Sequence, residues 1–141
     1  MPDGESLYPF EVVLQGTPVT LQSGNTKRKE AWKKQVIEAA RKRQYETCEL
    51  VWLDHRPLAV TIYYFPSDPM EGDIDNIVKL IVDALIGVAY LNDKVVERVI
   101  VQKFEPKVEW EFTTLSDLLA LALETEPVSY THLTLPTIYS V

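Results

Sequence analysis

The chain has 141 residues, of which 46% are hydrophobic and 25% charged, the balance of an ordinary globular protein. This length fits one domain, since domains usually span about 100 to 200 residues. The single cysteine, Cys48, excludes an intramolecular disulfide framework and a cysteine-rich zinc site. No apolar run reaches the roughly 18 residues of a membrane span, and the N-terminus lacks the pattern of a secretory signal. We therefore expect a cytoplasmic protein without a membrane partner.

Charge is distributed unevenly along the chain. The formal net charge is −7, yet residues 26–45 carry a local net charge of +6, with only Glu30 and Glu38 as acidic residues, so the remainder carries −13. A basic face on an acidic protein can still bind phosphates, because counterion release depends on local contacts. The alternative is a solvated helix face that binds nothing. The basic residues are Lys27, Arg28, Lys29, Lys33, Lys34, Arg41, Lys42 and Arg43.

The first half of the chain predicts two strands and one long helix. Residues 10–14 are a β-prone run. Thr26 is the expected cap of a helix over residues 27–43, where apolar residues recur every three or four positions and basic residues occupy much of the remaining surface. Residues 58–65 alternate as a strand does, and Pro66 ends the run.

The second half predicts two further helices and two further strands. Apolar residues at helical spacing predict a helix over residues 74–86, with Gly87 as its stop. Residues 95–104 and 108–113 are predicted strands, and residues 117–124 a short helix. This order of elements suits a small α+β domain in which helices pack against a mixed sheet.

The last fourteen residues, 128–141, contain no charged residue. Their sequence, VSYTHLTLPTIYSV, resembles the translation of a transposase-based sequencing adaptor read in one frame. We therefore expect a non-native tail, exclude it from the predicted fold, and place the domain at residues 1–127. The alternative is a genuine β-prone tail, because Thr, Tyr, Leu, Ile and Val all suit a strand.

Three aspartates and a lysine suggest a metal-dependent hydrolase. Asp73 and Asp75 lie at the start of the predicted apolar helix, and Asp93 follows beyond its end. That helix is roughly 18 Å long, so Asp93 reaches the pair only if the loop folds back or the next strand crosses the helix start. Convergent carboxylates would suit Mg²⁺, which can activate water and neutralise the leaving oxygen of a phosphodiester. Lys79, one helical turn after Asp75, could orient the phosphate or stabilise the transition state.

Each of these residues also has a purely structural interpretation. Aspartates at a helix start are favoured by capping and by the helix dipole. Asp75, Lys79 and Asp83 are spaced four apart and could form only surface ion pairs. Asn92 and Asp93 could form an ordinary turn before a strand. Spacing alone leaves the choice open.

The stretch GDIDNIVKLIVDALIGVAYLNDKVVERV, residues 72–99, resembles the signature of the RusA family of Holliday-junction resolvases: D-x-D-N, a lysine, D-A-L, a glycine and an acidic pair before a strand. The resemblance implies a RusA-like domain and a homodimeric, Mg²⁺-dependent endonuclease that cuts four-way DNA junctions in recombination and repair, in a bacterium or prophage. It implies metal ligands at Asp73, Asp75 and Asp93, a catalytic lysine at Lys79, and supporting roles for Asn76 and Asp83.

The chain departs from the family pattern at two places. Asn92 occupies a position that is acidic in the family, and Met70 and Glu71 lie where family members can carry arginines. The basic helix over residues 27–43 would then have to supply the contacts to DNA phosphates. Two alternatives stay open: a non-catalytic DNA-binding or assembly protein that retains the fold, and a broader Mg²⁺-dependent nuclease that acts on other branched DNA.

Overall fold

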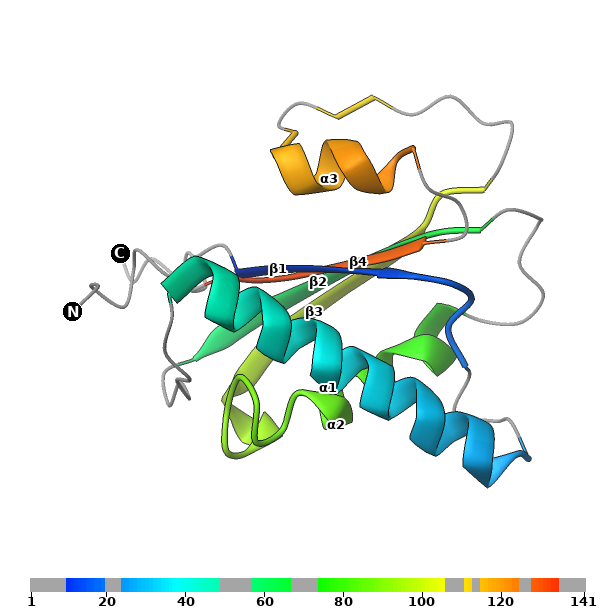
Figure 1. The fold of residues 1–141 in the computed structure, drawn as a ribbon, viewed down its shortest axis with the longest axis vertical. Helices are drawn as coiled ribbons and strands as arrows, with labels where there is room; N and C mark the ends of the chain where they lie inside the picture. The colour runs from blue at the N-terminus through cyan, green and yellow to red at the C-terminus, as the bar shows by residue number, and fades with distance from the viewer. Residues whose placement is uncertain are drawn as a thin grey trace.

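The structure is a computed structural model, and it describes residues 10–19, 24–48, 57–66, 74–105, 111–112, 115–124 and 128–134. Within these residues the chain forms one four-stranded mixed sheet with helices on both of its faces (Figure 1). The predicted α+β class with a mixed sheet is therefore confirmed.

The sheet has the strand order β1-β4-β2-β3. The outer strand β1 (Phe10–Gln15) and the inner strand β2 (Leu58–Phe65) both pair antiparallel with β4 (Val128–Thr134). On its other side β2 pairs parallel with β3 (Val96–Lys103). Seven of the eight residues of β2 are buried, because helices cover both faces of this central strand.

A parallel pair of strands needs a long crossover connection, and here that connection carries the helical elements of the site. It contains the 3₁₀ turn η2 (Ile74–Ile77), the helix α2 (Val78–Ala84) and the 3₁₀ turn η3 (Asp93–Val95). The helix predicted over residues 74–86 is thus shorter than expected and begins as a 3₁₀ turn. Gly87 follows it at φ +85°, a backbone conformation that glycine adopts without strain.

The helices α1 (Thr26–Cys48) and α2 lie on one face of the sheet and the short helix α3 (Asp117–Ala122) lies on the other (Figure 1). The predicted apolar face of α1 is confirmed, since Trp32 and Val36 belong to the main buried cluster with residues of β1, β2 and α2. A second buried cluster beneath α3 contains mainly aromatic and aliphatic side chains: Phe65, Phe104, Leu119, Ala122, Val128 and Tyr130.

The start of α1 differs from the prediction by one residue. The side chain of Asn25, rather than that of Thr26, accepts a hydrogen bond from the backbone N–H of Arg28 at 3.0 Å. Asparagine is a strong N-cap residue because its side-chain oxygen satisfies one of the free N–H groups at a helix start. Thr26 is accordingly the first residue of the helix.

The predicted strand over residues 108–113 is not found where it can be examined. Glu111 and Phe112 lie outside any strand, and the other four residues fall outside the part of the chain that the structure describes. The remaining predicted elements agree with the observed ones to within a few residues.

The last strand is the largest difference from the prediction. We excluded residues 128–141 from the fold, yet β4 lies between β1 and β2, and Leu133 is fully buried between Phe10 and Val60. Leu133 belongs to the main buried cluster and Tyr130 to the cluster beneath α3, so both faces of β4 meet buried side chains, as a β-prone segment can. A non-native origin of the segment stays a prediction.

We expect a chain that ends at Pro127 to lose cooperative unfolding. Without β4, the strand β1 has no described partner in the sheet, and the buried side chains of Tyr130 and Leu133 are lost. Thermal unfolding followed by circular dichroism measures this. A truncated chain that unfolds cooperatively at the same temperature as the full chain would show that β4 is dispensable.

Candidate active site

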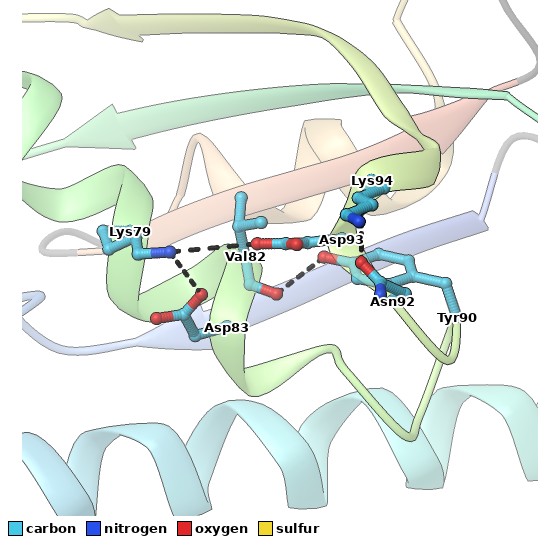
Figure 2. Close-up of polar contacts among 7 residues, drawn as sticks. All are labelled: Lys79, Val82, Asp83, Tyr90, Asn92, Asp93 and Lys94. Atoms are coloured by element: carbon cyan, nitrogen blue, oxygen red, sulfur yellow. Dashed lines mark hydrogen bonds and ion pairs between the residues drawn. The ribbon is translucent and has the colours of Figure 1, made fainter.

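The segment between α2 and β3 folds back along α2. The hydroxyl of Tyr90 donates a hydrogen bond to the carbonyl oxygen of Val82 at 2.6 Å (Figure 2). The backbone N–H of Gly87 donates to the carbonyl oxygen of Tyr90 at 2.6 Å. Burial, followed by the negative charges of Asp93 and Asp83, raises the pKa of Tyr90. The phenol therefore stays protonated and keeps its role as the donor that closes this turn.

A second contact fixes the same turn to α1. Gln44 is buried, and its Nε2 donates a hydrogen bond to the carbonyl oxygen of Val88 at 2.6 Å. Buried polar groups are costly without a partner, so this hydrogen bond couples the position of the turn to that of the basic helix. A contact between Gln44 and Val88, 44 positions apart in the sequence, thus helps to determine where the segment before β3 lies.

Asn92 shapes the backbone around Asp93. Its side-chain oxygen accepts a hydrogen bond from the backbone N–H of Lys94 at 2.9 Å and caps the turn η3 (Figure 2). This is the local side-chain contact that makes asparagine common in turns. The residue that departs from the family pattern therefore has a structural role directly beside Asp93.

Lys79 lies between two carboxylates. Its Nζ is 3.0 Å from Oδ1 of Asp83 and 3.8 Å from Oδ2 of Asp93 (Figure 2). The sequence left open whether the loop folds back along the helix or the next strand crosses the helix start. In the structure the loop folds back, and this brings Asp93 beside α2. The hydrogen bond to Asp83, then the charge of Asp83, raises the pKa of Lys79, and Asp93 adds to the rise. The Lys79 side chain is 53% exposed, so these pairs contribute little to stability.

The other predicted acidic residues are described only in part. Asp73 lies outside the described residues, and for Asp75 and Asn76 the structure describes the backbone of η2 but not the side chains. Among the described side chains, no group of three histidine, cysteine, aspartate or glutamate residues could hold a metal ion. The carboxylate of Asp93, one of the three predicted ligands, nevertheless fits a hard cation, because it offers the oxygen donors that such a cation prefers.

A hollow with a volume of about 620 Å³ opens between α1 and this cluster, and we call it the α1–α2 hollow. Lys33 and Lys34 lie on its α1 side, and Lys79, Asp83 and Asp93 lie on the other. Its full set of described lining residues is Glu30, Lys33, Lys34, Ile37, Lys79, Asp83, Ala84, Ile86 and Asp93. The basic helix therefore meets the candidate site directly through two of its lysines.

The remaining basic residues of α1 lie elsewhere. Arg28 lines a separate hollow of about 350 Å³ beside Trp32. Arg43 forms an ion pair with Glu46 at 3.6 Å. The other four residues are absent from the described linings of both hollows: Lys27, Lys29, Arg41 and Lys42. The predicted DNA-binding face is thus divided into a part beside the site and a part away from it.

Sequence reasoning missed three residues that build the site. Gln44 and Tyr90 hold the turn, and Ile86 lines the α1–α2 hollow. A glutamine between Arg43 and Tyr45 gave no sign of burial, and Tyr90 looks like any aromatic residue before a turn. The sequence carries no signal for Ile86 either, because its 42% exposure is visible only in the structure.

We expect Asp83→Asn to lower the pKa of Lys79 more than Asp93→Asn does. Asp83 supplies the shorter contact and the largest influence on that ammonium. The lysine side-chain resonances, titrated by NMR in the presence of EDTA, measure the pKa in each variant. Asp117→Asn on α3 is the matched control, and an equal effect of all three substitutions would contradict the described pairing.

The described part of the chain contains no helix long and apolar enough to cross a membrane. Residues 10–109 match the model of a protein family described as Endodeoxyribonuclease RusA. The match includes every acidic residue of the candidate site and Lys79, and it ends before α3 and β4. No curated protein matches the chain.

Proposed function

Because this chain belongs to the RusA family of endodeoxyribonucleases, we propose that it is a Mg²⁺-dependent enzyme that resolves four-way DNA junctions in recombination and repair. The observation that carries the proposal is the α1–α2 hollow, which joins a cationic helix face to Lys79, Asp83 and Asp93. Hydrolysis of a phosphodiester needs both features, because the phosphate must be held and the charge on its oxygens must be neutralised.

We propose that Asp73, Asp75 and Asp93 hold the divalent cation. They offer only oxygen ligands, as Mg²⁺ prefers. When bound, such a cation makes water more acidic and neutralises charge on the leaving oxygen. The packing of η2, which contains Asp75, against β3, which begins three residues after Asp93, supports this assignment.

The other residues of the site hold and orient the substrate in this proposal. The ammonium of Lys79 binds an oxygen of the scissile phosphate, and Asp83 positions that ammonium from one helical turn away. Asn76 supports the start of the helical segment. The basic side chains of α1 bind phosphates, and those outside the hollow contact DNA farther from the cut: Lys27, Arg28, Lys29, Arg41, Lys42 and Arg43.

A cleavage assay tests this function. We expect the unmutated protein to introduce paired, symmetric nicks into a labelled four-way junction with Mg²⁺, to leave a linear duplex of matching sequence intact, and to lose activity in EDTA. Asp75→Asn should reduce cleavage by at least about 100-fold while binding persists, because a ligand is lost but the cationic face is kept. Asp117→Asn, an exposed aspartate on α3, is the control and should cleave normally.

The remaining outcomes separate the alternatives. Equal cutting of flaps and junctions would identify a broader nuclease for branched DNA. Junction binding without cutting by the unmutated protein, in any divalent cation, would identify a DNA-binding or assembly protein and would overturn the proposal.

We propose further that the enzyme acts as a homodimer. A four-way junction presents two equivalent strands, and a two-fold symmetric dimer presents two equivalent sites. The edge of the sheet supports this: β3 is the end strand of the described sheet, and Val99 and Ile100 on it are 42% and 44% exposed. An exposed edge strand with apolar side chains is normally covered or paired.

Ile100→Glu is expected to shift the protein from dimer to monomer, because a carboxylate would be buried in the proposed interface. Light scattering after size-exclusion chromatography measures the mass. Leu121→Glu on α3, where the leucine is 54% exposed, is the matched control and should leave the dimer intact. A monomeric mass for the unmutated protein at micromolar concentration would contradict the dimer itself.

A further inference from the structure

The α1 side of the α1–α2 hollow is a single helix face. Its lining residues occupy positions 30, 33, 34 and 37, and this spacing of three and four places them along one side of a helix. Lys33 and Lys34 contribute two positive charges and Glu30 one negative charge. Across the hollow, Lys79 is already paired with Asp83 and Asp93. None of the ion pairs of the described residues involves Lys33 or Lys34, so their charge is available to an incoming phosphate.

The size of the hollow suits a short stretch of one DNA strand. Its volume is about 620 Å³, and it is open to solvent. Sites of roughly 300 to 1,000 Å³ hold a ligand of drug size, which is comparable with one or two nucleotides.

Three of the residues that line the hollow are apolar, and we call them its apolar floor: Ile37, Ala84 and Ile86. The Ile86 side chain is 42% exposed. Ile86 is also held firmly, because its backbone N–H donates to the carbonyl of Asp83 at 3.2 Å and it forms a β-bridge with Tyr90. In a duplex the bases are stacked inside, so an apolar surface beside a cationic wall fits a nucleotide whose base has left the stack.

From the charge, size and floor of the hollow, we infer that it holds one unstacked DNA strand beside the phosphate that is cut. Phosphates of that strand bind Lys33 and Lys34, and the sugar or base of the adjacent nucleotide packs on Ile86. The inference rests on the proposed nuclease function and specifies the form of the substrate at the site: a locally single strand, as found where the arms of a junction meet, rather than intact duplex.

Binding of single-stranded DNA tests the cationic wall. Fluorescence anisotropy with a labelled oligothymidine in EDTA compares Lys33→Gln/Lys34→Gln with Arg98→Gln/Lys103→Gln, which removes the same charge from β3, outside the hollow. We expect the first variant to lose affinity at least about tenfold. The slope of the logarithm of its binding constant against the logarithm of the salt concentration should become shallower by about 1.4, the value for two phosphate contacts to a single strand. We expect less than about a threefold loss for the second variant.

A fluorescent base tests the apolar floor. With 2-aminopurine beside the cut phosphate of a junction, binding of the unmutated protein in EDTA should raise the fluorescence, because the base leaves the stack. Ile86→Ala should reduce this rise by at least half, whereas Leu121→Ala, an exposed leucine on α3, should not. Circular dichroism confirms that each variant is folded.

The two proposals fail in different ways. If the unmutated protein cuts junctions but the two double variants lose the same single-strand affinity, or binding leaves the 2-aminopurine signal unchanged, the inference is overturned and the nuclease function stands. If the unmutated protein cuts no branched DNA in any divalent cation, the proposed function fails whatever the variants bind.

Discussion

The site depends on the closed turn between α2 and β3. Two hydrogen bonds, from the Tyr90 hydroxyl to the Val82 carbonyl and from Gln44 to the Val88 carbonyl, return the chain to the side of α2. Without that return Asp93 would start from the far end of the helix, beyond the reach of Lys79. A buried hydroxyl and a buried amide therefore determine whether the charged groups on the surface can act together.

Local patterns in the sequence were sufficient to predict most helices and strands, and to predict the contact between Lys79 and Asp83 within the site. The four-residue spacing of Lys79 and Asp83 predicts their ion pair, and the bounds of β2 follow from its alternation and Pro66. The approach of Asp93 to the site was implied only by the family resemblance. Spacing could not give it, because it depends on the contact of Gln44 with Val88, 44 positions away, and no local pattern encodes that contact. The prediction leaves β4 out of the fold because residues 128–141 resemble a translated adaptor. In the structure this β-prone segment pairs with both β1 and β2.

The acidic composition and the nuclease family are compatible because charge acts locally. Eight basic residues are concentrated on α1, and only Lys33 and Lys34 among them line the α1–α2 hollow. The carboxylates across the hollow are partly neutralised by Lys79. A protein with a negative net charge can thus present positive charge where a phosphate would arrive, while the chain outside residues 26–45, with a net charge of −13, disfavours other contacts with nucleic acid.

The central position of β4 has a consequence for how the protein reaches its folded state. Phe10 in β1 lies opposite Leu133, and Val60 in β2 lies opposite the same residue, so the middle of the sheet is closed by contacts between distant parts of the chain. Such high contact order slows folding, since loop entropy is lost before any pairing compensates for it. During synthesis, β1 and β2 emerge from the ribosome before β4, and until β4 follows their open edges are exposed to pairing with other chains.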